Sequence, residues 1–151
     1  MIESVSISDS TYQKPPHKFE AGTPAIAEII GLGAAVAYVN SLNREALNLE
    51  EHSLVESTLN ALSGIPRIEL IGEPAERLSV ISFNIEGAHP HDVGQLLDQQ
   101  GVAVRTGHHC TMPLMSRLNI PGTVRASFSF YSNQEDSRRL IEAVEKATDL
   151  L

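Results

Sequence analysis

From position 24 onward, apolar residues recur first at helical spacing and then at strand spacing. The first run predicts a helix, with Thr23 as its N-cap and Pro24 at its first position. The apolar positions of this helix are Ile26, Ile29, Ile30, Gly33, Ala34, Ala37 and Tyr38. A second helix is predicted over residues 48–63, with Asn48 as its cap and Gly64 as its stop.

Shorter runs farther along predict strands. The strands are expected over residues 68–71, 78–85, 102–105 and 124–130, with helices over 91–100 and 132–151. On the last strand, Val124 and Ala126 face one way and Arg125 faces the other. This order predicts an α/β fold of the α+β kind, with a small mixed or mainly antiparallel sheet covered by helices and the first long helix packed beside it.

Residues 1–23 differ from the rest because they are polar and irregular. We expect them to form an extended segment that lies on another surface. Residues 24–46 are expected to be a connecting helix, and residues 47–151 a C-terminal small domain. The chain has 151 residues, of which 42% are hydrophobic and 20% charged, which is a globular composition.

Charge and cysteine content narrow the choice of partners and compartment. The formal net charge is −8, from 11 basic and 19 acidic side chains, so we expect no nucleic-acid partner. One cysteine excludes a disulfide framework within the chain and suits a reducing compartment. No run approaches about 18 apolar residues and the N-terminus lacks a signal-peptide pattern, so we expect a cytoplasmic protein without membrane attachment.

The residue types suited to chemistry gather at residues 105–110, which read RTGHHC and follow a predicted strand. An arginine and two imidazoles near a thiol favour the thiolate, which is the nucleophilic form. The spacing leaves open a second interpretation, a partly buried structural cysteine with incidental histidines. It also leaves open a metal site, for which the candidate ligands are His89, His91, His108, His109 and Cys110.

Three segments carry a resemblance to a known family. They are RTGHHC with the following MPL at 112–114, FEAGTP at 19–24, and VRAS at 124–127. In this order and spacing the chain resembles the SUF-system type of cysteine desulfurase, a class V, fold-type I enzyme dependent on pyridoxal 5'-phosphate (PLP). The resemblance covers essentially the whole chain but only the C-terminal portion of the family, which implies the small domain of the fold-type I enzymes.

The resemblance implies a role for five residues. Cys110 corresponds to the catalytic cysteine, which attacks the substrate sulfur and becomes a persulfide. Arg125 corresponds to the arginine that binds the substrate carboxylate, and Arg105 is a weaker candidate for a second anionic contact. Gly22 and Thr23 correspond to residues that reach the PLP phosphate of the partner subunit.

The cofactor lysine of the family has no counterpart here. The lysines are Lys14, Lys18 and Lys146, and Lys18 lies before FEAGTP, where its position does not match the Schiff-base lysine. The resemblance therefore implies a domain that depends on a separate PLP-binding large domain, on which residues 1–23 would pack. The isolated chain is expected to be inactive.

In the complete enzyme, the resemblance implies that L-cysteine is the substrate, that alanine is released, and that the sulfur passes to an acceptor protein for iron–sulfur cluster assembly. It further implies a homodimer. A different class of function stays open, a non-enzymatic persulfide carrier or partner-binding module that uses Cys110 without PLP chemistry.

Overall fold

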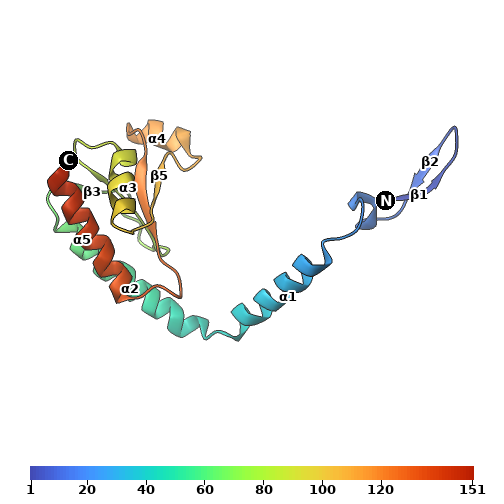
Figure 1. The fold of residues 1–151 in the computed structure, drawn as a ribbon, viewed down its shortest axis with the longest axis horizontal. Helices are drawn as coiled ribbons and strands as arrows, with labels where there is room; N and C mark the ends of the chain where they lie inside the picture. Colours follow the sequence, from blue (N-terminus) through green and yellow to red (C-terminus); the bar gives the residue numbers. More distant parts are fainter. The chain divides into compact units, whose positions relative to one another are not determined.

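The computed structural model describes residues 1–151 as two compact units, Met1–Asn43 and Arg44–Leu151 (Figure 1). The C-terminal unit is built around four antiparallel strands in the order β3-β4-β6-β5. These strands are β3 (Ile68–Leu70), β4 (Val80–Ile85), β5 (Arg105–Gly107) and β6 (Thr123–Ser127). Its helices are α2 (Arg44–Ser63), α3 (Pro90–Gln99), α4 (Met112–Leu118) and α5 (Gln134–Leu150). The prediction of a small, mainly antiparallel sheet with helices is confirmed.

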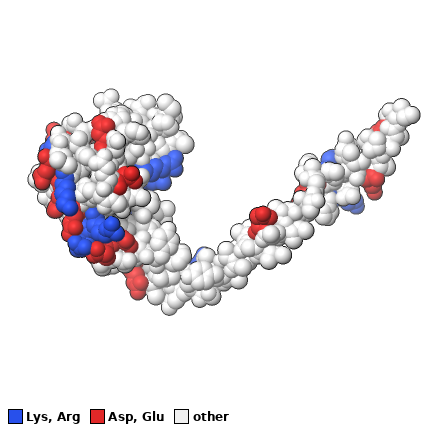
Figure 2. Space-filling model, viewed as in Figure 1, with Lys and Arg blue, Asp and Glu red and all other residues white.

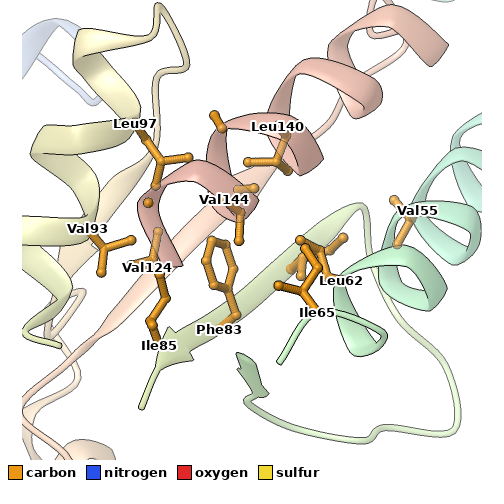
Figure 3. Packing of buried hydrophobic residues seen from close by; sticks show 14 residues of the cluster. Val55, Leu62, Ile65, Phe83, Ile85, Val93, Leu97, Val124, Leu140 and Val144 are labelled. Atoms are coloured by element: carbon orange, nitrogen blue, oxygen red, sulfur yellow. The ribbon is translucent and has the colours of Figure 1, made fainter. Parts of the chain in front are cut away.

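One face of the sheet forms the hydrophobic core with α2, α3 and α5. Ile81, Phe83 and Ile85 alternate along β4 and are almost completely buried, as the period of two predicts. All three belong to one cluster with side chains of the three helices, which include Leu62, Val93, Leu97, Leu140 and Val144, and Figure 3 shows Phe83 and Ile85 among them. Full burial of each such side chain contributes about 1.5–3 kcal/mol. The core therefore fixes the register of the central strands.

The opposite face of the sheet carries polar side chains, because every second residue of each strand points there. The ladder sets Ser82 of β4 opposite Arg125 of β6, and Arg125 opposite Arg105 of β5. Two arginines from neighbouring strands are thus placed side by side, away from the hydrophobic core. This face positions the candidate site.

The N-terminal unit contains a hairpin of β1 (Ile2–Val5) and β2 (Ser10–Tyr12), a short 3-10 turn η1 (His17–Phe19), and α1 (Ile26–Ser41). The hairpin is an element that the sequence pattern does not predict, because its strands are short and mostly polar. None of the α1 residues is buried. Glu28 is the only charged residue of α1, whose surface is otherwise white in Figure 2, whereas the C-terminal unit mixes both signs of charge.

Two expectations for the first helices are wrong. The prediction of Thr23 as the N-cap fails because α1 begins at Ile26 after Ala25, and no side chain caps it. Helix α2 begins at Arg44 and not at position 48, because the sequence REAL at its start consists of strong helix formers. The expectation that α1 packs beside the sheet stays a prediction, since α1 and the sheet belong to different units.

Three further boundaries differ from the prediction. Strand β5 begins at Arg105 and not at position 102, because only from there does the backbone pair with β6. Helix α4 lies where the sequence pattern predicts no helix, and its signals are Pro113 in the first turn and left-handed Asn119 at its C-cap. Helix α5 begins at Gln134 and not at position 132, because Asn133 and Asp136 form its capping box. No single helix is long and apolar enough to cross a membrane. Helices α1 and α2 reach the required length and composition only when they are taken together, and the chain is bent between them.

Candidate active site: a cysteine turn beside two arginines

Cys110 lies at the third position of a tight turn that follows β5. His109 and Cys110 have φ angles of 52° and 62°, and the Thr111 N–H donates to the His108 carbonyl at 2.8 Å. Two successive left-handed residues closed by such a bond define a type I′ turn. That turn is normally made by Gly, Asn or Asp, and a left-handed residue of another type costs on the order of 1–3 kcal/mol. The exposed thiol is therefore presented on a strained piece of backbone.

Local hydrogen bonds hold this turn from within. The Cys110 N–H donates to Nδ1 of His108 at 3.0 Å, and the Thr111 hydroxyl donates to the His108 carbonyl at 2.8 Å. His108 therefore accepts bonds through both its side chain and its backbone, and its Nδ1 must be unprotonated to do so. These contacts offset part of the strain in the turn.

Arg105 approaches the thiol from the end of the strand. Its Nη2 donates toward Sγ of Cys110 at 4.0 Å. The guanidinium at this distance places a permanent positive charge beside the sulfur. The structure thus brings together the two residues that the sequence placed five positions apart.

Arg125 lies directly across the ladder from Arg105. Like charges in directly opposed positions are destabilising, and Nε of Arg125 is buried without a hydrogen-bond partner. Neither arginine forms an ion pair with an acidic side chain of the chain. The arrangement is suited to an anion, since a carboxylate would supply both the counter-charge and the missing acceptor.

His109 connects the turn to β6. Its Nε2 lies 3.1 Å from the Thr123 carbonyl and 2.9 Å from the Thr123 hydroxyl. Burial lowers the pKa of His109 below its ordinary value of 6.5, although the bond to Thr123 opposes this effect, and the nearby charges of Arg125, Arg105 and His108 lower it further. The imidazole is therefore neutral at neutral pH. Spacing along the sequence does not single out this contact, because Thr123 lies 14 residues away.

Gly122 lets β6 approach the base of the turn. A Cβ atom added at Gly122 would lie 2.7–2.9 Å from backbone atoms of Gly107, which real Cβ atoms do not tolerate. The Gly122 carbonyl also accepts from Nδ2 of the buried Asn84 at 3.0 Å. Sequence reasoning missed this residue, although the Pro121-Gly122 pair immediately before a strand is a usable signal.

The remaining candidates are placed as follows. Gly22 and Thr23 belong to the N-terminal unit, where Gly22 has a φ of 83° and both precede the uncapped start of α1. Nδ1 of His91 lies 3.1 Å from the Thr106 hydroxyl, and His89 caps α3. No group of three or more His, Cys, Asp or Glu side chains is arranged to hold a metal ion, so the candidate metal ligands are not brought together.

Comparison with known proteins agrees with this fold and identifies the family. The aminotransferase class-V family matches residues 1–140. The chain belongs to this family. A class-V relative from Streptomyces coelicolor, a probable cysteine desulfurase, is 48% identical over 147 residues, covering 96% of this chain and 35% of the relative. A cysteine desulfurase from Serratia proteamaculans is 47% identical over 152 residues, which cover 100% of this chain and 37% of the relative.

Two solved cysteine desulfurase structures match the fold of this chain. The cysteine desulfurase CsdA from Escherichia coli matches with a TM-score of 0.89 and 34% identity, over 100% of this chain and 37% of that one. The apo cysteine desulfurase from Thermococcus onnurineus NA1 matches with a TM-score of 0.88 and 38% identity. This match covers 99% of this chain and 38% of the Thermococcus chain. The predicted fold and the predicted family are confirmed, and the chain spans little more than a third of the length of these relatives.

Proposed function

We propose that this chain is the sulfur-accepting C-terminal part of a cysteine desulfurase, in which Cys110 takes the sulfur of L-cysteine. The observation that carries the proposal is the exposed thiol on a strained turn, 4.0 Å from the Arg105 guanidinium and next to the opposed Arg125. The names of the relatives from Streptomyces and Serratia support the same activity. A nucleophile beside an anion-binding pair suits an amino-acid substrate that carries both a carboxylate and a thiol.

In the proposed reaction, Arg125 and Arg105 hold the substrate carboxylate and thereby direct its sulfur toward Cys110. The Cys110 thiolate attacks that sulfur, so an S–S bond forms and the substrate C–S bond breaks. The electron pair of the broken bond goes to the substrate carbon, which gains a proton and leaves as alanine. Cys110 keeps the transferred sulfur as a persulfide, and a second thiol can remove it by exchange.

The cofactor is expected to be PLP, and the residues of this chain fit its phosphate end. Gly22 and Thr23 precede a helix start that no side chain caps, which leaves backbone N–H groups and a hydroxyl free for an anion. When bound, PLP withdraws electrons from the substrate and so weakens its C–S bond. Lys14, Lys18 and Lys146 are all exposed, and Lys18 lies over the Tyr12 ring at 5.7 Å. We therefore propose that the Schiff-base lysine comes from outside this chain.

Partners and compartment follow from the same proposal. A PLP-binding large domain, a second subunit reached through Gly22 and Thr23, and an acceptor protein for iron–sulfur cluster assembly would complete the system. Free Cys110 is exposed, so its chemistry requires a reducing compartment such as the cytoplasm. The second candidate function is a persulfide carrier loaded by another protein, which the exposure of the free Cys110 thiol favours.

A chimeric enzyme tests the proposal. The matched segment of the Serratia desulfurase is replaced by this chain, and PLP loading is confirmed by the visible absorbance before alanine release from L-cysteine is measured. We expect alanine release that the Cys110→Ser variant loses. A PLP-loaded chimera that releases no alanine would contradict the enzyme proposal. If Cys110 of the 151-residue chain is still converted to a persulfide by polysulfide, the carrier function remains.

A further inference from the structure

We propose that His109 is a positioning residue for Cys110. Its imidazole ties the strained turn to β6 and so keeps the thiol beside Arg105. The inference rests on the proposed function, because it assigns the means by which the sulfur-accepting thiol is held.

Only one contact of the turn reaches outside its own stretch of chain. The hydrogen bonds made by His108 and Thr111 join residues at most four positions apart, and the Arg105 contact joins residues five positions apart. The contact of His109 with Thr123, in contrast, spans 14 residues and ends on β6. It is therefore the link that fixes the turn relative to the strand that carries Arg125.

The contacts with Thr123 indicate which ring nitrogen of His109 carries the proton. A carbonyl oxygen can only accept, so a hydrogen bond to the Thr123 carbonyl at 3.1 Å assigns the proton to Nε2 of His109, while the Thr123 hydroxyl at 2.9 Å is compatible with either tautomer. Nδ1 then carries the lone pair, and it is buried without a partner. Since Nδ1 contacts no donor and a second proton would lie buried near Arg105 and Arg125, His109 does not serve to exchange protons with the thiol. Its contribution is to hold geometry.

The backbone explains why such an anchor is needed. His109 and Cys110 both adopt positive φ, which neither residue type favours, so an unanchored loop would relax toward negative φ. Relaxation would move Sγ away from the arginine pair. A displacement of about 1 Å at a reacting group can lower a rate by about 100-fold.

Matched variants of the 151-residue chain test the geometry. His109→Gln keeps an N–H at the position of Nε2, whereas His109→Leu removes it while filling similar space. NMR measures the one-bond Cα–Hα coupling of Cys110, which distinguishes positive from negative φ, and the ¹⁵N shifts of His109, which report its tautomer. We expect the wild type to show positive φ and a proton on Nε2. His109→Gln should keep the positive φ, and His109→Leu should lose it.

Activity in the Serratia chimera provides the second readout. His109→Leu should lower kcat for alanine release by about 100-fold, with little change in KM, because the carboxylate is held by the arginines. His109→Gln should restore most of the rate. Resonances of the hydrophobic core must be unchanged in both variants, whereas those of Thr123 are expected to shift because His109 contacts it. The positioning role is overturned if folded His109→Leu keeps the positive φ at Cys110 and the wild-type kcat. An inactive wild-type chimera would instead contradict the proposed function and leave the NMR result valid.

Discussion

Arg125 holds a charge that the folded chain leaves without a counter-ion, and its Nε is buried without a partner. At the scale of single residues, this orphaned donor is the feature that most directly implies a bound anion. The alternation along β6 predicts which way Arg125 points. The sequence could not show that Arg105 lies opposite, because that requires the register between β5 and β6.

Replacement of Arg125 in the chimera tests whether this residue binds the substrate carboxylate. A hydrogen bond to a charged group is worth about 1.5–3 kcal/mol, so Arg125→Ala should lower kcat/KM for L-cysteine by about 10- to 150-fold. Arg125→Lys should recover only part of the loss, because a point charge does not reproduce the guanidinium fork. Arg117→Ala, on the exposed side of α4, is the control and should change nothing. An unchanged kcat/KM in Arg125→Ala would remove this residue from the site.

The lowered pKa of His109 predicts a loss of stability in acid. Below pH 6.5 the unfolded chain takes up a proton on this residue, while the folded chain, in which Arg105, Arg125 and His108 face the imidazole, does so only at lower pH. The free energy of unfolding should therefore fall as the pH decreases from 6.5 toward the folded-state pKa. His109→Gln should lack this component of the decline. Urea unfolding of both proteins at pH 7.5 and pH 5 makes the comparison, and parallel pH dependences would contradict the assignment.

At the scale of elements, alternation and capping signals predict the core strands and α3 but not the cysteine turn. Ile81, Phe83 and Ile85 reveal β4 because burial selects for apolar residues at a period of two. His109 and Cys110 give no turn signal, since neither is a usual type I′ residue. Helix α4 was missed because Pro113 reads as a break unless it is recognised as a first-turn residue.

The close approach of β5 and β6 depends on a glycine, which gives a stability prediction. Gly122→Ala would place a methyl group 2.7 Å from the Gly107 carbonyl carbon, so the strands must separate at the base of the turn. We expect a loss of about 1–3 kcal/mol in the free energy of unfolding, as for other overpacked sites. Gly64→Ala, whose added Cβ would meet only ordinary contacts at 3.4 Å, is the matched control. Equal effects of the two substitutions in urea unfolding would refute the packing argument.

At the scale of the whole molecule, the hydrophobic core draws all its buried members from residues 55–147. The C-terminal unit should therefore fold without residues 1–43. We expect a chain of residues 44–151 to unfold cooperatively and to keep the positive φ at Cys110. Chemical denaturation followed by circular dichroism, together with the Cys110 coupling, would measure this. A truncated chain without a cooperative transition would show that the core described here is insufficient.

The family was accessible from short motifs, because RTGHHC and FEAGTP are specific runs, and the role proposed for Cys110 comes from the same resemblance. The arrangement that makes the thiol a plausible sulfur acceptor was not accessible. It depends on a tertiary contact from His109 to Thr123 and on two arginines brought together by strand pairing.

The central claim is that Cys110 receives the sulfur of L-cysteine. Its most direct test is the mass of the Cys110 peptide after the PLP-loaded chimera has reacted with L-cysteine labelled with heavy sulfur, without acceptor or reductant. The account predicts that this peptide gains one labelled sulfur atom and that one alanine is released for each sulfur bound. Release of alanine with Cys110 left unmodified would contradict it.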